Sequence, residues 1–120
     1  MTIERRDVTV TTAANGVGSG VINFGFNSEW AECLRLKVDY ATDFDAGGDI
    51  TVTDSDGTLL AKSNTKTDFD GGVSAGAVLD ASAAAVSGAW AVPVIKGPVT
   101  VAVAQGGDTK KVTVSVWLKH

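Results

Sequence analysis

The last part of the chain, Val99 to Leu118, carries the pattern that most constrains its fold. Valine occupies every second position from Val99 to Val103, and apolar residues do the same from Val112 to Leu118. Successive side chains of a strand point to opposite faces, so a period of two indicates a strand with one buried face. The Gly-Gly-Asp at 106–108 has the composition of a turn. The pattern therefore predicts two strands joined as a β-hairpin.

Shorter stretches with the same period recur along the chain, separated by turns rich in Gly, Asn and Asp. Besides the two above, the predicted strands are Asp7–Thr12, Val17–Phe26, Glu32–Tyr40, Ile50–Thr53, Thr58–Ser63 and Trp90–Ile95, the last placed at a sheet edge by Pro93. About eight short strands, with turns about every 8–12 residues, are typical of a small sandwich or barrel. We therefore expect an all-β fold, with 1–120 as one domain: an antiparallel two-sheet sandwich of jelly-roll topology.

The alternation also predicts which side chains form the core. In Glu32–Tyr40 it places Leu34 and Leu36 inside and Cys33 and Arg35 outside. The predicted core residues are Val8, Val10, Ile22, Phe24, Leu34, Leu36, Val38, Ile50, Val52, Val101, Val103, Val112, Val114 and Val116.

One stretch, Val73–Ala89, does not follow a period of two. Its alanines favour a helix, and Val73, Ala77 and Ala81 would share a helical face, whereas Gly76 opposes a helix. A short helix near 74–86 and an irregular loop are equally supported.

Composition and charge exclude several classes of partner. The net charge is −4, and the basic residues are scattered, which argues against nucleic acid and anionic membranes. The one cysteine, Cys33, cannot form an internal disulfide, which fits synthesis in a reducing cytoplasm. The first residues lack the apolar stretch of a secretory signal, and no run approaches the roughly 20 apolar residues of a membrane helix.

Aspartates crowd three predicted turns, and calcium binds through several such oxygens. The candidate ligands are Asp43, Asp45, Asp49, Asp54, Asp56, Asp68 and Asp70. However, no Glu follows Asp54 at the offset that the twelve-residue calcium loop requires. Asp also favours turns by bonding to backbone amides, and we favour this explanation over a metal site.

The sequence shows no catalytic motif. The single histidine, His120, ends the chain and is expected to fray, and Cys33 has no neighbouring histidine to activate it. Paired carboxylates of a glycosidase need a cleft, whereas those here lie in turns. We therefore expect no enzymatic activity and no cofactor.

The three tryptophans are candidate interface residues, since Trp is enriched at protein interfaces. Core filling is the simpler explanation for Trp30, in a connection, and for Trp90, near an edge. Trp117 differs, because its strand points it away from Val116 and Leu118. We expect either the 73–89 stretch or a neighbouring protein to cover it, and favour the neighbour.

The second half of the chain contains the stretches Ile50–Asp54, Pro93–Ala104 and Val112–Trp117. These stretches resemble those of small β-sandwich structural proteins of tailed bacteriophages, in style and without a diagnostic motif. The alanine-rich stretch 81–85 departs from this resemblance.

The resemblance implies a non-enzymatic virion protein, made in the host cytoplasm. Its expected role is capsid decoration or cement on the outer capsid surface. The expected partners are the major capsid protein or other virion proteins, and further copies of itself in a homo-oligomer. The alternative is a carbohydrate-binding sandwich module of a tail or host protein, assisted by calcium, and a small hydrolase is a third.

Overall fold

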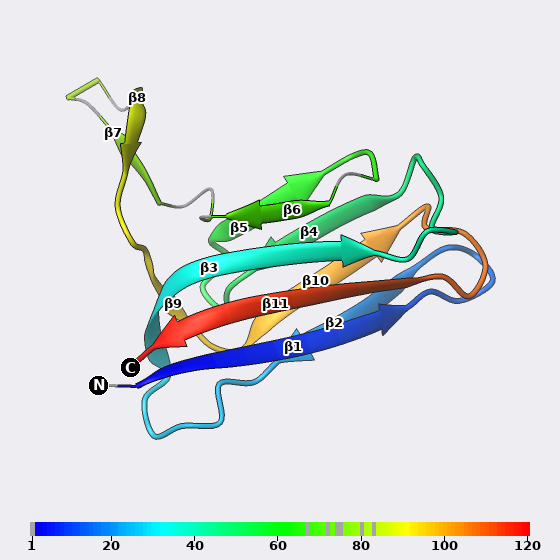
Figure 1. The fold of residues 1–120 in the computed structure, drawn as a ribbon, viewed down its shortest axis with the longest axis horizontal. Coiled ribbons are helices and arrows are strands. Elements are labelled where there is room, and N and C mark those ends of the chain that lie inside the picture. The colour runs from blue at the N-terminus through cyan, green and yellow to red at the C-terminus, as the bar shows by residue number, and fades with distance from the viewer. Residues whose placement is uncertain (1, 67, 72, 74–75, 80, 83) are drawn as a thin grey trace.

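The chain folds into two antiparallel sheets packed face to face, with a two-stranded arm extending from one end (Figure 1). The structure, a computed structural model, describes residues 2–66, 68–71, 73, 76–79, 81–82 and 84–120. The strands are β1 Ile3–Thr11, β2 Gly18–Ile22, β3 Trp30–Tyr40, β4 Asp49–Thr53, β5 Leu59–Ser63, β6 Phe69–Gly71, β7 Ala77–Leu79, β8 Ala85–Trp90, β9 Val94–Lys96, β10 Val99–Ala104 and β11 Lys111–Lys119.

The strand order follows a nested pattern. One sheet has the order β1-β11-β3-β6, with β9 also paired to β3, and the other has the order β2-β10-β4-β5. Thus β1 pairs with β11, β2 with β10, β3 with β6 and β4 with β5, as if one long hairpin had been rolled up. This is the jelly-roll arrangement, so the predicted all-β sandwich and its topology are confirmed.

The predicted hairpin between 99 and 118 is wrong. β10 lies in one sheet between β2 and β4, whereas β11 lies in the other between β1 and β3. The connection 105–110 therefore crosses from sheet to sheet. A period of two indicates that a strand buries one face, but it does not indicate which strand lies beside it. In the structure, the valines of β10 and β11 face one core from opposite sides.

Twelve of the fourteen predicted core residues are buried; Val8 and Leu34 are partly exposed. The cause at Leu34 is a β-bulge: Trp117 pairs with Arg35, but the next residue of β11, Leu118, pairs with Cys33. Because Leu34 has no partner in β11, the residues of β3 that precede it point to the opposite faces from those that regular alternation predicts. Cys33 is consequently buried, and its predicted outward position is wrong.

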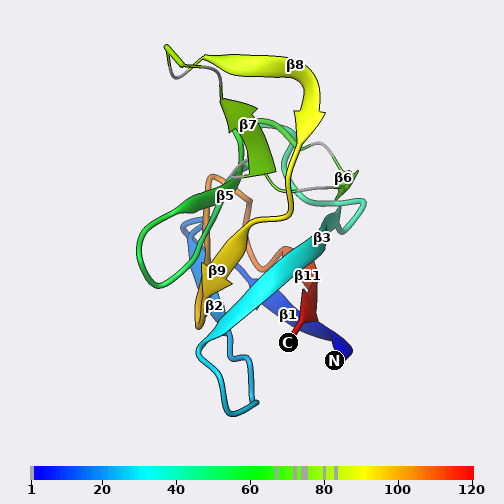
Figure 2. The ribbon, with the colours of Figure 1, turned by 90° about the vertical axis from the view of Figure 1, so that its left-hand side faces the viewer.

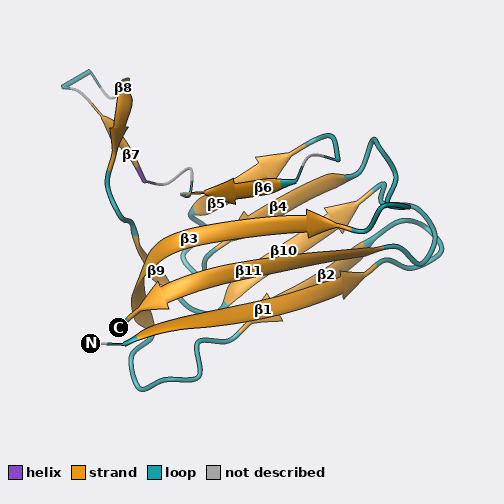
Figure 3. Cartoon of the chain, viewed as in Figure 1, coloured by secondary structure: helices purple, strands orange, loops and turns teal. Residues whose placement is uncertain are grey.

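The described residues of the stretch 73–89 lie mainly in strands. β7 and β8 pair as an arm that extends beyond the sandwich in two perpendicular views (Figures 1 and 2). Among the described residues of this stretch, Gly76 alone, just before β7, has a helical conformation (Figure 3). The expected short helix near 74–86, like the irregular loop, is therefore wrong for the described residues, while positions 74, 75, 80 and 83 lie outside them.

Candidate functional site

Three connections meet at one end of the sandwich: 12–17, 41–48 and 105–110. The Gly106 N–H donates to the Gly16 carbonyl, and the Asp45 N–H donates to the Gly106 carbonyl. The Phe44 ring is buried beneath them, 4.9 Å from the Tyr40 ring between centroids. The side chain of Asp43 pairs with Lys110, at 3.2 Å. These contacts cross-link the three loops, which also line a hollow of about 490 Å³.

Asp54 lies at the other end of β4, and both oxygens of its carboxylate accept hydrogen bonds from backbone N–H groups. It is buried, and Oδ1 accepts hydrogen bonds from the backbone N–H groups of Asp56 and Thr58 at 3.1 and 2.9 Å. Oδ2 accepts a third from the N–H of Lys96, at 3.1 Å. Asp54 thus closes the β4–β5 hairpin turn and fastens it to β9.

The calcium candidates do not converge. Asp49 and Asp54 are separated by the length of β4, so the 41–48 loop and the β4–β5 turn lie at opposite ends of it. Asp68 instead accepts a hydrogen bond from the Tyr40 N–H, at 3.1 Å. The side chain of Asp70 lies outside the description. Across the described residues, no three His, Cys, Asp or Glu side chains gather closely enough to hold a metal ion.

The two residues considered for catalysis occupy structural positions. Burial raises the pKa of the Cys33 thiol to about 11, so the thiolate is disfavoured. His120 is not frayed: its N–H and carbonyl both bond to Thr2, at 3.0 and 2.9 Å. Its ring stacks on Phe26, 3.7 Å between centroids, and its Nε2 lies 3.2 Å from a carboxylate oxygen of Glu4.

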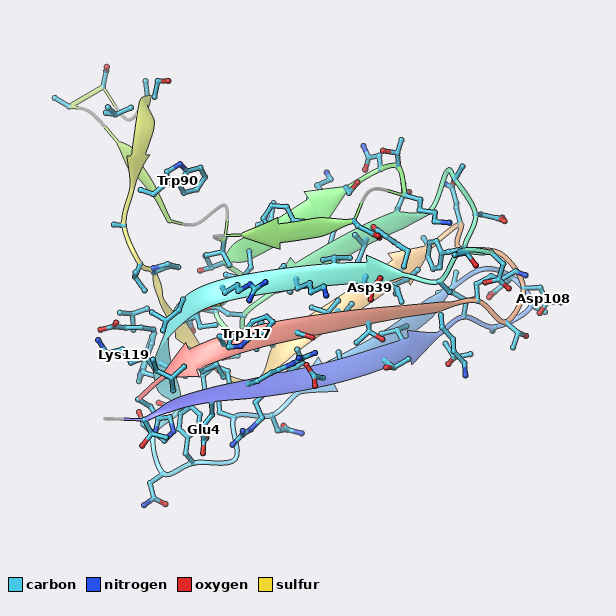
Figure 4. All side chains as sticks on the ribbon, viewed as in Figure 1. Glu4, Asp39, Trp90, Asp108, Trp117 and Lys119 are labelled. Atoms are coloured by element: carbon cyan, nitrogen blue, oxygen red, sulfur yellow. The ribbon has the colours of Figure 1, made fainter. Side chains whose placement is uncertain are left out.

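Trp117 stands on the outer face of its sheet (Figure 4), and two arginines contact its ring. Arg5 on β1 and Arg35 on β3 are its direct cross-strand neighbours, and their guanidinium carbons lie 5.0 and 4.5 Å from its ring centre. Cation–π contacts at these distances shield the indole. Of the two covers considered for Trp117, the described part of the 73–89 stretch lies away from it in the arm (Figure 4), and the two arginines contact the ring instead.

Trp30 and Trp90 are exposed, so core filling is wrong for both. Trp30 is 43% exposed and begins β3; it pairs with Lys96, whose ammonium nitrogen lies 5.6 Å from its ring centre. Val94 is 61% exposed and pairs with Glu32, on the same outer face. We call Trp30, Val92 and Val94 the terminal corner. It adjoins a hollow of about 430 Å³ lined by Phe26, Asn27, Ser28, Trp30 and His120.

A second apolar opening, which the sequence did not predict, lies between β5 and β6. We call it the edge cleft; it measures about 290 Å³ and is lined by Val38, Tyr40, Ile50, Ala61, Lys62, Ser63 and Phe69. The Tyr40 hydroxyl is buried there with no hydrogen-bond partner. Ser63, the nearby hydroxyl on β5, donates to the Thr65 carbonyl instead, at 2.6 Å. Burial raises the pKa of the Tyr40 phenol.

Comparison with models of known protein families and with curated proteins finds no match for this chain. Within the described residues, no helix is both long and apolar enough to cross a membrane.

Proposed function

We propose that this chain is a non-enzymatic structural protein of a bacteriophage virion, a decoration or cement protein that binds the outer surface of the capsid. The observation that carries the proposal is the terminal corner. Trp30, Val92 and Val94 are all exposed by two-fifths or more, and Trp30 and Val94 share one outer face. An exposed apolar group that includes an aromatic residue is typical of a protein-binding surface.

The charges around the corner support a protein partner. Lys96 lies 3.8 Å from Glu29, and Lys119 lies 3.8 Å from Glu32. The apolar side chains are therefore bordered by paired charges that are at least partly exposed, as in an interface with an apolar centre and a polar rim. Trp117, by contrast, is already contacted by Arg5 and Arg35, so it has less surface left for a partner.

The carbohydrate-binding alternative is less well supported at this corner. A sugar stacks on an open aromatic face, whereas the Lys96 ammonium stands over the ring of Trp30. The jelly-roll fold does not distinguish a capsid-binding protein from a carbohydrate-binding one, because it occurs in both capsid and lectin domains.

The test is cosedimentation of the purified protein with capsids of the virus whose genome encodes it. Trp30→Ala and Val94→Asp should each weaken capsid binding by about thirtyfold, corresponding to about 2 kcal/mol for an interface hot spot. The matched control is Val21→Asp: Val21 is 48% exposed on β2, in the other sheet, and should tolerate the change.

Absence of capsid binding by the wild-type chain would reject the proposal. Equal loss in the Val21→Asp control would reject the terminal corner as the binding surface. Binding of the free protein to glycans, lost in Trp30→Ala, would favour the carbohydrate-binding alternative instead.

A further inference from the structure

The hollow between the three loops at the end of the sandwich, which we call the loop hollow, offers mainly polar groups. It measures about 490 Å³, within the range of small-ligand pockets. Each loop contributes one polar side chain to its lining: Asn15, Asp45 and Gln105. The other described lining residues are small and leave the backbone open, namely Ala14, Gly16, Ala46, Gly47 and Gly107. A ligand therefore meets three polar side chains around an open backbone surface.

The backbone of the three loops is fixed before any ligand binds. The Thr12 hydroxyl donates to the Gly107 carbonyl at 2.6 Å and accepts from the Lys110 N–H at 2.8 Å. Gly107 has a φ of 92°, and a methyl group on it would lie 3.0 Å from a carboxylate oxygen of Asp45. Glycine at this position thus lets the Asp45 carboxylate lie directly against the 105–110 loop. Because the loops are already ordered, binding costs little additional conformational entropy.

The three polar side chains have hydrogen-bonding capacity left for a ligand. Asn15 Oδ1 accepts from the Val17 N–H at 3.1 Å, which leaves the amide N–H groups of Asn15 as donors. Within the part of the chain that the structure describes, the side chains of Asp45 and Gln105 have no hydrogen-bond or ion-pair partner. A carboxylate only accepts, whereas a carboxamide both donates and accepts. The loop hollow therefore presents donors and acceptors together.

This combination selects among classes of ligand. The Asp45 carboxylate repels anions, and no Lys or Arg is among the described residues that line the hollow. An ammonium group only donates, so it would leave the amide N–H groups of Asn15 and Gln105 unmatched. No lining side chain offers a large apolar surface. A hydroxyl group both donates and accepts, so a ligand with several hydroxyl groups matches the set.

We propose that the loop hollow binds a neutral saccharide. The Asp45 carboxylate accepts hydrogen bonds from two neighbouring hydroxyl groups, and the amides of Asn15 and Gln105 donate to hydroxyl oxygens. The loop hollow and Trp30 of the terminal corner lie at opposite ends of β3, an eleven-residue strand (Figure 1). One copy can therefore bind a protein surface at one end and a saccharide at the other. The site uses neither Trp30 nor calcium.

A titration of the full chain, followed by two-dimensional amide NMR in the presence of a calcium chelator, tests the proposal. The probes are the methyl glycosides of glucose, galactose, mannose and N-acetylglucosamine. We expect at least one of them to shift the backbone amides of 14–16, 45–47 and 105–107 in a saturable manner. Millimolar affinity is expected, because the hollow has no aromatic ring on which a sugar could stack.

Two substitutions in one loop separate the site from a general effect of charge. Asp45→Asn keeps the size of the side chain and removes its charge, and should weaken binding about tenfold, or about 1.4 kcal/mol. Asp43→Asn is the matched control, because the Asp43 carboxylate pairs with Lys110 and does not line the hollow. Its affinity should stay within about twofold of wild type. Equal losses in the two variants would overturn the proposal.

A third variant keeps the test independent of any folding defect in Asp45→Asn. Ala14→Leu narrows the loop hollow without removing a hydrogen-bonding group and should also weaken binding about tenfold. The amide spectrum of each variant without sugar checks its fold. Undiminished binding in a folded Ala14→Leu protein would overturn the proposal.

Three results with the wild-type chain would also overturn the proposal. They are the absence of a saturable shift with all four sugars, sugar-induced shifts centred on Trp30, and tighter binding of methylammonium than of any sugar in the loop hollow. Shifts centred on Trp30 would instead favour the carbohydrate-binding alternative at the terminal corner. None of these measurements involves capsids, so the saccharide site can fail while the proposed function stands, and the reverse.

Discussion

The carboxylate of Asp54 accepts a hydrogen bond from the backbone N–H of Lys96, forty-two residues further along the chain, at 3.1 Å. The Lys96 carbonyl in turn accepts from the Ser55 N–H, at 3.0 Å. Lys96 is also the cross-strand partner of Trp30. The β4–β5 turn of one sheet thus holds the β9 edge of the other, on which the terminal corner is built.

Asp54→Ala should lower the free energy of unfolding by about 3 kcal/mol, because three backbone donors lose a buried charged acceptor. Thermal unfolding followed by circular dichroism measures the change. Asp56→Ala is the matched control, two residues away in the same turn and exposed, and should stay within about 0.5 kcal/mol of wild type. Equal losses in the two variants would contradict the structural role of Asp54.

Calcium should leave the melting temperature unchanged, because the acidic side chains are divided between the two ends of β4 and Asp54 is already hydrogen-bonded. Millimolar calcium acting on a micromolar site would add about 4 kcal/mol of stability. Melting curves in calcium and in chelator make the comparison. A difference of several degrees would show that the loops form a metal site.

Gly48→Ala should destabilise the protein by about 1–3 kcal/mol, because a methyl group there would collide with the buried Phe44 ring and lie 3.1 Å from the Asp45 carbonyl oxygen. Gly47 is the control: a methyl group there meets no atom within 4 Å. Gly47→Ala should be neutral or slightly stabilising, by up to about 1 kcal/mol. Chemical denaturation of both variants gives the two values, and equal effects would refute the Phe44 contact as the cause.

Trp117→Ala should lower stability by about 1–2 kcal/mol, because it removes two cation–π contacts, with Arg5 and Arg35. Capsid binding should be unchanged, since those arginines already contact the ring. Melting curves and cosedimentation, run in parallel, separate the two effects. Weaker binding with unchanged stability would restore Trp117 as an interface residue.

Alkaline pH should destabilise the protein through Cys33. The folded thiol has its pKa raised to about 11, above that of the unfolded chain, so the unfolded state loses its proton first as pH rises. This contribution is fully present below about pH 8.5 and is lost progressively up to pH 11, by at most about 3 kcal/mol. The difference between wild type and Cys33→Ala, measured by denaturation from pH 8 to 11, isolates it. A constant difference would contradict the raised pKa.

The sequence predicted the elements better than their partners. The period of two located β3, β4, β5, β10 and β11, and the inward face of most of them. It did not reveal that 105–110 joins two sheets, because a strand buries the same face in a hairpin and in a sandwich crossing. Nor did it reveal the bulge opposite Trp117, which is set by pairing with another strand.

The candidate surfaces were predicted in part. Trp30 and Trp90 were identified as interface candidates, but their exposure depends on β9 and on the arm, whose alanine-rich sequence fits helix, loop or strand. The edge cleft arises from residues on four strands, and Tyr40 looks like any other core residue of an alternating strand. Its unpartnered hydroxyl is a property of the assembled core alone.

The nested pairing also sets the order in which the chain can fold as it is synthesised. Of its four nested pairs, only β4 with β5 joins strands that are close in sequence. β11 is synthesised after the other described strands, yet it occupies the interior of its sheet between β1 and β3. Until β11 leaves the ribosome, the backbone edges of β1 and β3 that pair with it have no partner, and a chain that stops before residue 111 lacks an inner strand. Such truncated products would remain exposed to proteases, so synthesis through β11 becomes a condition for the protein to persist in the cell.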